Sequence, residues 1–231
     1  MIVGTVVCPH PPLLLRELTG GQDVAADLRK ACTEALEALA GLAPDAVVVV
    51  GGHEVSGGCA GGAVPVREFG GTGERVPRDR ALPLSLGVAR RLLDTVGYAR
   101  PVHMVTVAWD ASAAEAEALG ARIAQRPGRV ALLVMGDGSA RRGLRAPGHL
   151  DERAFGFDEE IRRSLAEGDR DGLLRMDPAL AEELLVAGRA AFQAMAGAVG
   201  RGGAPVRPEV LYADDPFGVM YFVAVWPCVT G

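Results

Sequence analysis

Short apolar runs that alternate with segments of helical periodicity restrict the fold of this chain more than any other feature. Residues 2–7, 46–50 and 130–135 are almost wholly apolar, which is typical of parallel strands that are covered on both faces. Segments in which apolar residues recur at the helical period lie between them. This alternation predicts an α/β fold with a mostly parallel central sheet and helices on both faces. Because no internal repeat or linker interrupts the pattern, we expect residues 1–231 to form a single domain.

The other elements are predicted from the same two periods. Residues 54–80 are rich in glycine and proline, so we expect this stretch to be irregular apart from a short strand near 64–67. It does not match a phosphate-binding loop, and a flexible lid over a pocket fits its composition better. Further strands are expected at 102–107, 206–212 and 218–226, and helices at 24–42, 82–96, 112–125, 152–166 and 179–199.

Composition and charge are those of a soluble globular protein, with 49% hydrophobic and 23% charged residues. The 24 basic and 29 acidic residues give a net charge of −5, so nothing builds the basic stripe that nucleic acid would need. No apolar run approaches the roughly 20 residues that span a bilayer, and no signal-peptide pattern is present. We therefore expect a cytoplasmic protein without nucleic-acid or membrane partners.

The four histidines are scarce enough to be considered one by one. His10 follows the first predicted strand in a loop that three prolines stiffen, and His53 follows the strand at 46–50. Ligand sites in open α/β sheets lie beyond the carboxyl ends of the strands, so these two side chains are expected at one edge. Two imidazoles and a carboxylate form the minimal facial site for non-haem Fe(II). The alternative is that both are ordinary half-exposed loop histidines.

Other residues at strand ends are open to two interpretations. Asp137 and Ser139 follow the strand at 130–135, where they could serve a catalytic loop or bond to the backbone of their own loop. Asp215, in an Asp-Asp-Pro sequence, could supply a metal carboxylate or belong to a solvated turn. We expect His103 to be a core residue, whereas His149 lies in a glycine-flanked loop and has no assigned role.

Several of these motifs together resemble one known family. Cys8-Pro9-His10-Pro11-Pro12 and Val50-Gly51-Gly52-His53 look like its two histidine motifs, and Met135-Gly136-Asp137-Gly138-Ser139-Ala140 is similar to its Ser-Gly-Asp-Leu-Ser-His sequence. The family is the class III extradiol ring-cleavage dioxygenases of the protocatechuate 4,5-dioxygenase beta-subunit type, whose fold the Memo-like proteins share. The resemblance extends over nearly the whole chain as a single extradiol-dioxygenase-like domain.

The resemblance implies a metal site and a class of substrate. His10 and His53 match the metal-binding histidines, and the third ligand would be Asp215, with Asp214 and Glu209 as alternatives. Fe(II) is the metal implied, with zinc, manganese or no retained metal as the other cases. The implied substrate is a small aromatic or related molecule, and a homo-oligomer is expected because family members commonly associate.

The sequence departs from the family where protons are transferred. The final histidine of the Ser-Gly-Asp-Leu-Ser-His sequence is replaced by Ala140, and Arg80 stands where another histidine is usual. The remaining candidates for catalytic roles are His149, Arg80, Asp137 and Ser139. Three hypotheses stay open: a metal-dependent dioxygenase, a non-catalytic metal- or ligand-binding protein on the same fold, and a zinc-dependent hydrolase or lyase.

Overall fold

A seven-stranded mixed sheet forms the centre of the molecule, in the order β3-β4-β2-β5-β1-β7-β6. The computed structural model describes residues 1–19, 23–72, 74–200 and 206–228. The neighbouring strands β4, β2, β5 and β1 are parallel, β3 and β7 run antiparallel to them, and β6 runs antiparallel to β7. The strands are β1 (Ile2–Cys8), β2 (Ala46–His53), β3 (Gly57–Cys59), β4 (Val102–Ala108), β5 (Val130–Met135), β6 (Glu209–Asp214) and β7 (Tyr221–Pro227).

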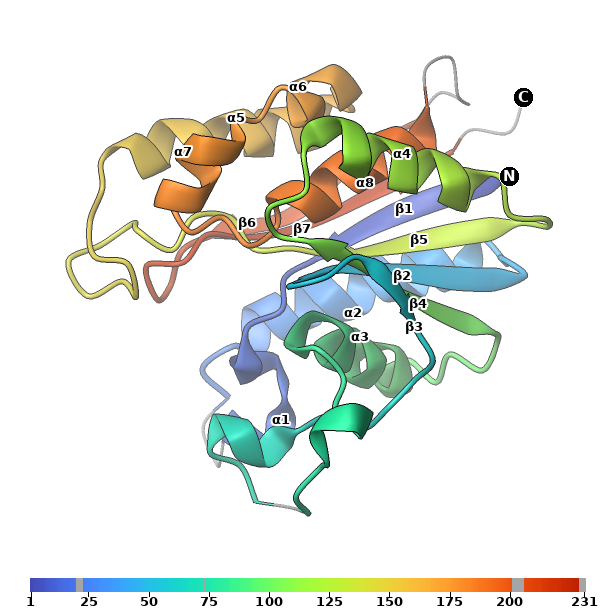
Figure 1. Ribbon diagram of the computed structural model, residues 1–231, viewed down its shortest axis with the longest axis horizontal. Coiled ribbons are helices and arrows are strands. Elements are labelled where there is room, and N and C mark those ends of the chain that lie inside the picture. The colour runs from blue at the N-terminus through green and yellow to red at the C-terminus, as the bar shows by residue number, and fades with distance from the viewer. Residues whose placement is uncertain (20–22, 73, 201–205, 229–231) are drawn as a thin grey trace.

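Helices cover both faces of this sheet (Figure 1). One face carries α2 (Ala26–Gly41) and α3 (Leu84–Thr95), and the other carries the remaining long helices. These are α4 (Ala113–Ala124), α5 (Arg153–Glu167) and α8 (Arg189–Val199), with the shorter α6 (Arg170–Leu174) and α7 (Pro178–Glu183). The arrangement confirms the predicted α/β class with a mostly parallel central sheet. The short elements that remain are α1 (Arg16–Thr19) and the 3-10 turns η1 (Pro12–Leu14), η2 (Val66–Phe69) and η3 (Arg78–Arg80).

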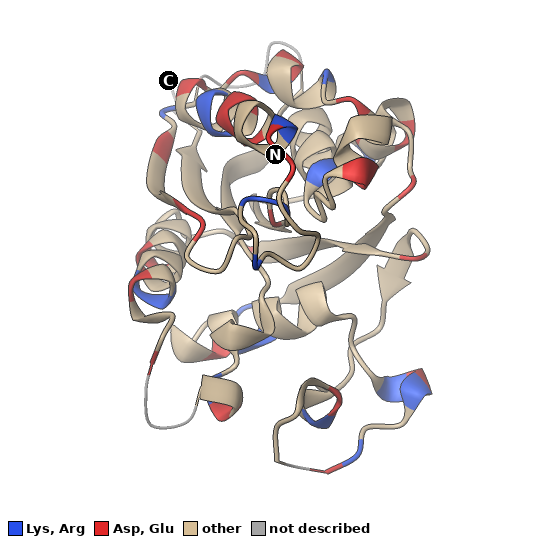
Figure 2. Ribbon diagram, turned by 90° about the vertical axis from the view of Figure 1, so that its left-hand side faces the viewer, with Lys and Arg blue, Asp and Glu red and all other residues tan. Residues whose placement is uncertain are grey.

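The central strands are apolar on both sides because each side faces its own hydrophobic core. In β2, Val47 and Val49 pack in the core beneath α2 and α3, whereas Val48 and Val50 pack in the core beneath α4 and α8. Successive side chains of a strand point to opposite faces, so one unbroken valine run supplies both cores. Charged residues of both signs lie on the helices and loops around this apolar sheet (Figure 2).

Local sequence signals account for where several helices begin. Ser112 and Glu115 form a capping box at the start of α4: the Glu115 backbone N–H donates to Ser112 Oγ, and the Ser112 backbone N–H donates to Glu115 Oε2. Asp177 caps α7, which has a proline at its first position. Within the described ranges, no helix combines the length and apolarity needed to cross a membrane.

Four predictions about local structure were wrong or incomplete. The helix expected at 179–199 is two helices, α7 and α8, and Leu185 between them has a left-handed φ of 56°. The strand expected near 64–67 is the turn η2, and β3 was not expected; residue 73 of this stretch lies outside the described residues. His103 is exposed and not in the core; it lies near the beginning of β4, before the part of that strand, Met104 to Thr106, that pairs with β3.

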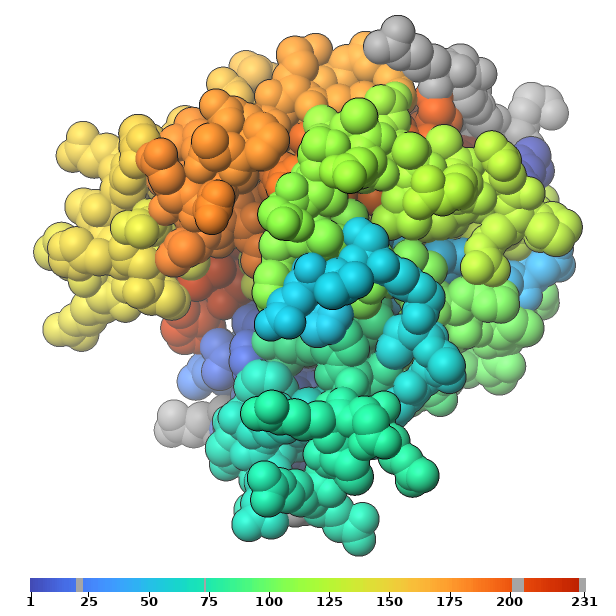
Figure 3. All heavy atoms as spheres, in the orientation of Figure 1, coloured from blue at the N-terminus to red at the C-terminus, as the bar shows by residue number. Residues whose placement is uncertain are grey.

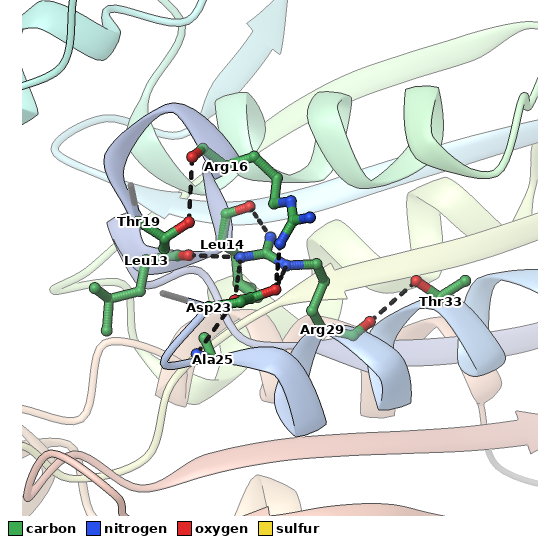
Figure 4. Close-up of polar contacts among 8 residues, drawn as sticks. All are labelled: Leu13, Leu14, Arg16, Thr19, Asp23, Ala25, Arg29 and Thr33. Carbon is green, nitrogen blue, oxygen red and sulfur yellow. Dashed lines mark hydrogen bonds and ion pairs between the residues drawn. The ribbon is translucent and has the colours of Figure 1, made fainter. Parts of the chain in front are cut away.

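A side-chain clamp fixes the segment that follows β1 (Figure 4). Arg29 of α2 donates to the backbone carbonyls of Leu13 and Leu14, and it also pairs with Asp23 through both carboxylate oxygens. These hydrogen bonds from Arg29 hold the pKa of Asp23 below its usual value. The clamp therefore joins η1 to α2 directly after the loop that carries His10.

Candidate functional site

A cavity of about 760 Å³ lies at the carboxyl ends of the parallel strands, where the sequence predicts a site. His10, from the loop after β1, and His53, the last residue of β2, both line it. The segment after β2 forms the opposite wall, and this segment makes up the lower front of the molecule in Figure 3. The polar side chains that line the cavity are His10, His53, Glu54, Glu68, Arg78 and Ser85.

Asp137 holds His10 in place. The His10 backbone N–H donates to Asp137 Oδ1 at 2.8 Å, and His10 Nδ1 lies 3.5 Å from the same oxygen. Nδ1 is buried and has no hydrogen-bond partner at bonding distance among the described residues, so this carboxylate is its polar neighbour. Burial raises the pKa of Asp137, and the nearby His10 opposes that shift. Because Nδ1 faces Asp137, Nε2 is the ring nitrogen left for the cavity.

An aromatic side chain packs against His53. Its ring meets the Trp109 ring edge to face, with the centroids 6.1 Å apart and the planes at 75°. Gly52 permits this approach, because a Cβ at residue 52 would lie 2.5 Å from Trp109 Nε1. Phe69 also lines the same cavity. The cavity thus offers two imidazoles together with two aromatic faces.

Ser139 lies outside this cavity and is fully buried. Its backbone N–H and its hydroxyl both donate to Asp158, at 2.9 and 2.5 Å. Burial raises the pKa of Asp158, while the hydrogen bonds from Ser139 and the charge of Arg142 oppose this shift. Ser139 therefore anchors the loop after β5 to Asp158 of α5. Because its hydroxyl is buried, it cannot reach a substrate. Its hydroxyl donates to a distant side chain, and not to the backbone of its own loop, which was the expected alternative to a catalytic role.

Asp215, the expected third metal ligand, also lies elsewhere. Arg142 Nε donates to Asp215 Oδ2 at 2.5 Å, and Arg142 Nη1 lies 3.3 Å from Asp158 Oδ2. The alternatives Glu209 and Asp214 lie at the two ends of the edge strand β6 and do not line the cavity. In the described part of the chain, no three His, Cys, Asp or Glu side chains come close enough together to hold a metal ion. The predicted set of three ligands is thus not assembled, although its two histidines share one cavity.

Arg80 and His149, the two basic candidates for catalytic roles, are exposed. Arg80 lies in η3, where its carbonyl accepts a hydrogen bond from the Ala63 N–H, and it is Arg78 of the same turn that lines the cavity. His149 has a left-handed φ of 59°, and its Nδ1 lies 3.0 Å from the Leu144 carbonyl oxygen. Neither side chain lines the cavity.

Sequence reasoning missed several residues of this cavity. Trp109 follows the end of β4 at the same sheet edge as His53, so the rule that located the histidines could also have found it. Phe69, Glu68 and Arg78 come from the irregular stretch after β2, whose path over the sheet no periodic pattern encodes.

Comparison with known proteins supports the fold and goes no further. No protein-family model matches this chain, and no curated protein matches it. Among solved structures, the chain is similar to an uncharacterized protein, JW3007, from Escherichia coli K12, with a TM-score of 0.59 and 13% sequence identity. The similarity covers 97% of this chain and 99% of that protein, so the two share one architecture over their whole lengths.

Proposed function

We propose that this protein binds a divalent metal ion through His10 and His53, and that a small aromatic ligand occupies the cavity around them. The observation that carries the proposal is the buried contact between His10 and Asp137. A metal-binding histidine typically presents its second ring nitrogen to a carboxylate, which fixes the ring and makes it a stronger ligand. Asp137 stands in this relation to His10 Nδ1, at 3.5 Å.

The donor set fits a metal ion in part. Imidazole nitrogens suit Fe(II), zinc and other transition metals. With only two such donors at the cavity, a bound ion would keep several positions for water or for oxygen atoms of the ligand. In that state the metal would supply Lewis acidity, which polarises the ligand and eases its deprotonation.

The remaining residues of the cavity determine which ligand fits. Trp109 and Phe69 offer faces on which an aromatic ring can pack, and Arg78 offers a cation for a negatively charged substituent. No histidine other than the two proposed metal ligands lines the cavity in the described residues. If the protein cleaves an aromatic ring, Glu54 or Glu68 is therefore the group that would accept the proton of the substrate.

Metal titration tests the first part of this proposal. The full chain, stripped with a chelator and dialysed, is titrated calorimetrically with Zn²⁺ and, without oxygen, with Fe²⁺. We expect one site per chain, and at least a tenfold loss of affinity in His10→Ala, in His53→Ala and in Asp137→Asn. His103→Ala is the matched control, because His103 is exposed on β4 outside this cavity. Unchanged affinity in both His10→Ala and His53→Ala, with native circular dichroism spectra, would refute the site.

Addition of catechol separates binding from catalysis. With the Fe²⁺-loaded protein, we expect a change in the absorption spectrum that neither the metal-free protein nor His53→Ala gives. Consumption of oxygen together with ring-cleavage product would favour a dioxygenase, and the same spectral change without oxygen consumption would favour a binding protein. Absence of any catechol response in the loaded protein would refute the aromatic ligand.

A further inference from the structure

A second cavity, of about 520 Å³, lies on the other side of Trp109 and Ala187, two residues that also line the first cavity. Most of its wall consists of apolar side chains from α7 and from the segment between α7 and α8, among them Ala181, Leu185 and Val186. Its volume and composition are those of pockets that bind small organic molecules. The sequence analysis gave this region no role.

The polar groups of this cavity carry a negative charge that nothing nearby neutralises fully. Asp110 and Glu182 line it, are exposed, and form no ion pair with any residue that the structure describes. Arg189 also lines it, but its buried guanidinium donates to the carbonyls of Trp109 and Ala111 and to the Gln193 side chain. Two carboxylates without an ion-pair partner among the described residues therefore share this cavity with one cation, whose guanidinium already makes three hydrogen bonds to other protein groups.

The backbone of the linker between the two helices presents an apolar side chain at this cavity. Leu185 has a φ of 56°, a conformation that disfavours residues with a Cβ, and its side chain is 45% exposed. Trp109 is 52% exposed beside it. Residues with strained backbone conformations occur preferentially at binding and active sites, and here the strained residue exposes a large apolar side chain to solvent.

We infer that this second cavity binds a small organic cation with an apolar body, whose ammonium group lies at Asp110 and Glu182. The apolar body packs on Leu185 and Trp109, and the Trp109 ring adds attraction for the cation. Binding here involves neither His10 nor His53, so it stands apart from the metal proposed for the first cavity.

Trp109 reports the binding directly. The other tryptophan, Trp226, is only 1% exposed, and its Nε1–H donates to the Leu165 carbonyl, so ligand-induced changes in emission come from Trp109. The full chain is titrated in a chelating buffer with three probes of equal size: 2-phenylethylammonium, 2-phenylethanol and 3-phenylpropionate. We expect saturable binding that is tightest for the ammonium and weakest for the carboxylate.

Charge variants then locate the cation. Asp110→Asn combined with Glu182→Gln should weaken ammonium binding roughly 2- to 30-fold, the range that two exposed ion pairs supply, and leave 2-phenylethanol unchanged. Glu37→Gln, an exposed change on α2, is the matched control and should have no effect. The inference is overturned if no probe binds saturably, if ammonium and carboxylate bind equally, or if the double variant binds the ammonium like the wild type. Because metal is chelated throughout, failure here is distinct from failure of the metal site.

Discussion

Gly120 should be the position at which one added methyl group disturbs this protein most clearly. Helices α4 and α8 touch backbone to backbone there: a Cβ at residue 120 would overlap the Ala194 carbonyl oxygen and lie 2.5 Å from the Ala198 nitrogen. Neither atom can rotate away, so in Gly120→Ala the two helices must move apart by roughly 1.5 Å to reach ordinary contact at roughly 3.5 Å.

The size of the effect follows from two opposing terms. Alanine favours a helix over glycine by about 1 kcal/mol, whereas overpacking a rigid contact costs about 1–3 kcal/mol or more. Because both clashing atoms belong to the backbone, we expect the upper part of that range and a net loss of about 2 kcal/mol. For a chain of this length that corresponds to a fall in melting temperature of roughly 4–8 °C.

Gly156 provides the matched control. It lies in α5, and no atom comes within 4 Å of a Cβ placed there, so Gly156→Ala should gain about 0.5–1 kcal/mol from helix propensity alone. Both variants are compared by urea and thermal unfolding, followed by circular dichroism at 222 nm as the conventional helix signal. If Gly120→Ala stabilised the protein as Gly156→Ala does, the close contact between α4 and α8 would be refuted. Since Trp109 precedes α4, its emission should also change in Gly120→Ala alone.

Two further predictions concern side-chain hydrogen bonds. Ser139→Ala removes the hydroxyl that donates to buried Asp158, so we expect urea titration to show a free energy of unfolding that is lower by about 1–3 kcal/mol. Metal affinity should stay as in the wild type. An unaltered urea midpoint would contradict the hydrogen bond between Ser139 and Asp158. Hydrogen bonds from Arg153 lower the pKa of Asp151 to about 2, so this carboxylate stabilises the fold above its ordinary pKa of 3.8 and loses that effect as the pH falls through about 2. In Arg153→Gln, NMR titration should find the Asp151 pKa raised toward 3.8, and a value still near 2 would exclude the Arg153 side chain as the main cause.

The fold could be predicted because its determinants are local. The apolar runs of β1, β2 and β5 are strands buried on both faces, as is typical of short apolar runs between helices in parallel sheets. The break between α7 and α8 could not be predicted in this way. Its apolar pattern continues through Leu184, Leu185 and Val186, and the left-handed turn is made by a leucine, which is not a residue that signals a helix end.

The site could be predicted only where it depends on strand ends. His10 and His53 share a cavity because parallel strands bring their carboxyl ends to one edge. The third expected ligand depended on the path of a long loop: Arg142, seventy-three residues before Asp215, reaches across and pairs with it. No spacing rule describes such a contact between a loop and a distant turn.

The clamp between Arg29 and the carbonyls of Leu13 and Leu14 has a thermodynamic consequence for the His10 loop. A loop that is already fixed before a ligand arrives loses little conformational entropy on binding, so more of the contact energy appears as affinity. Residues of α2 that never touch a ligand would then alter its dissociation constant. Selection for tight binding in this cavity would act on a helix packed beneath the sheet as well as on the histidines at its edge.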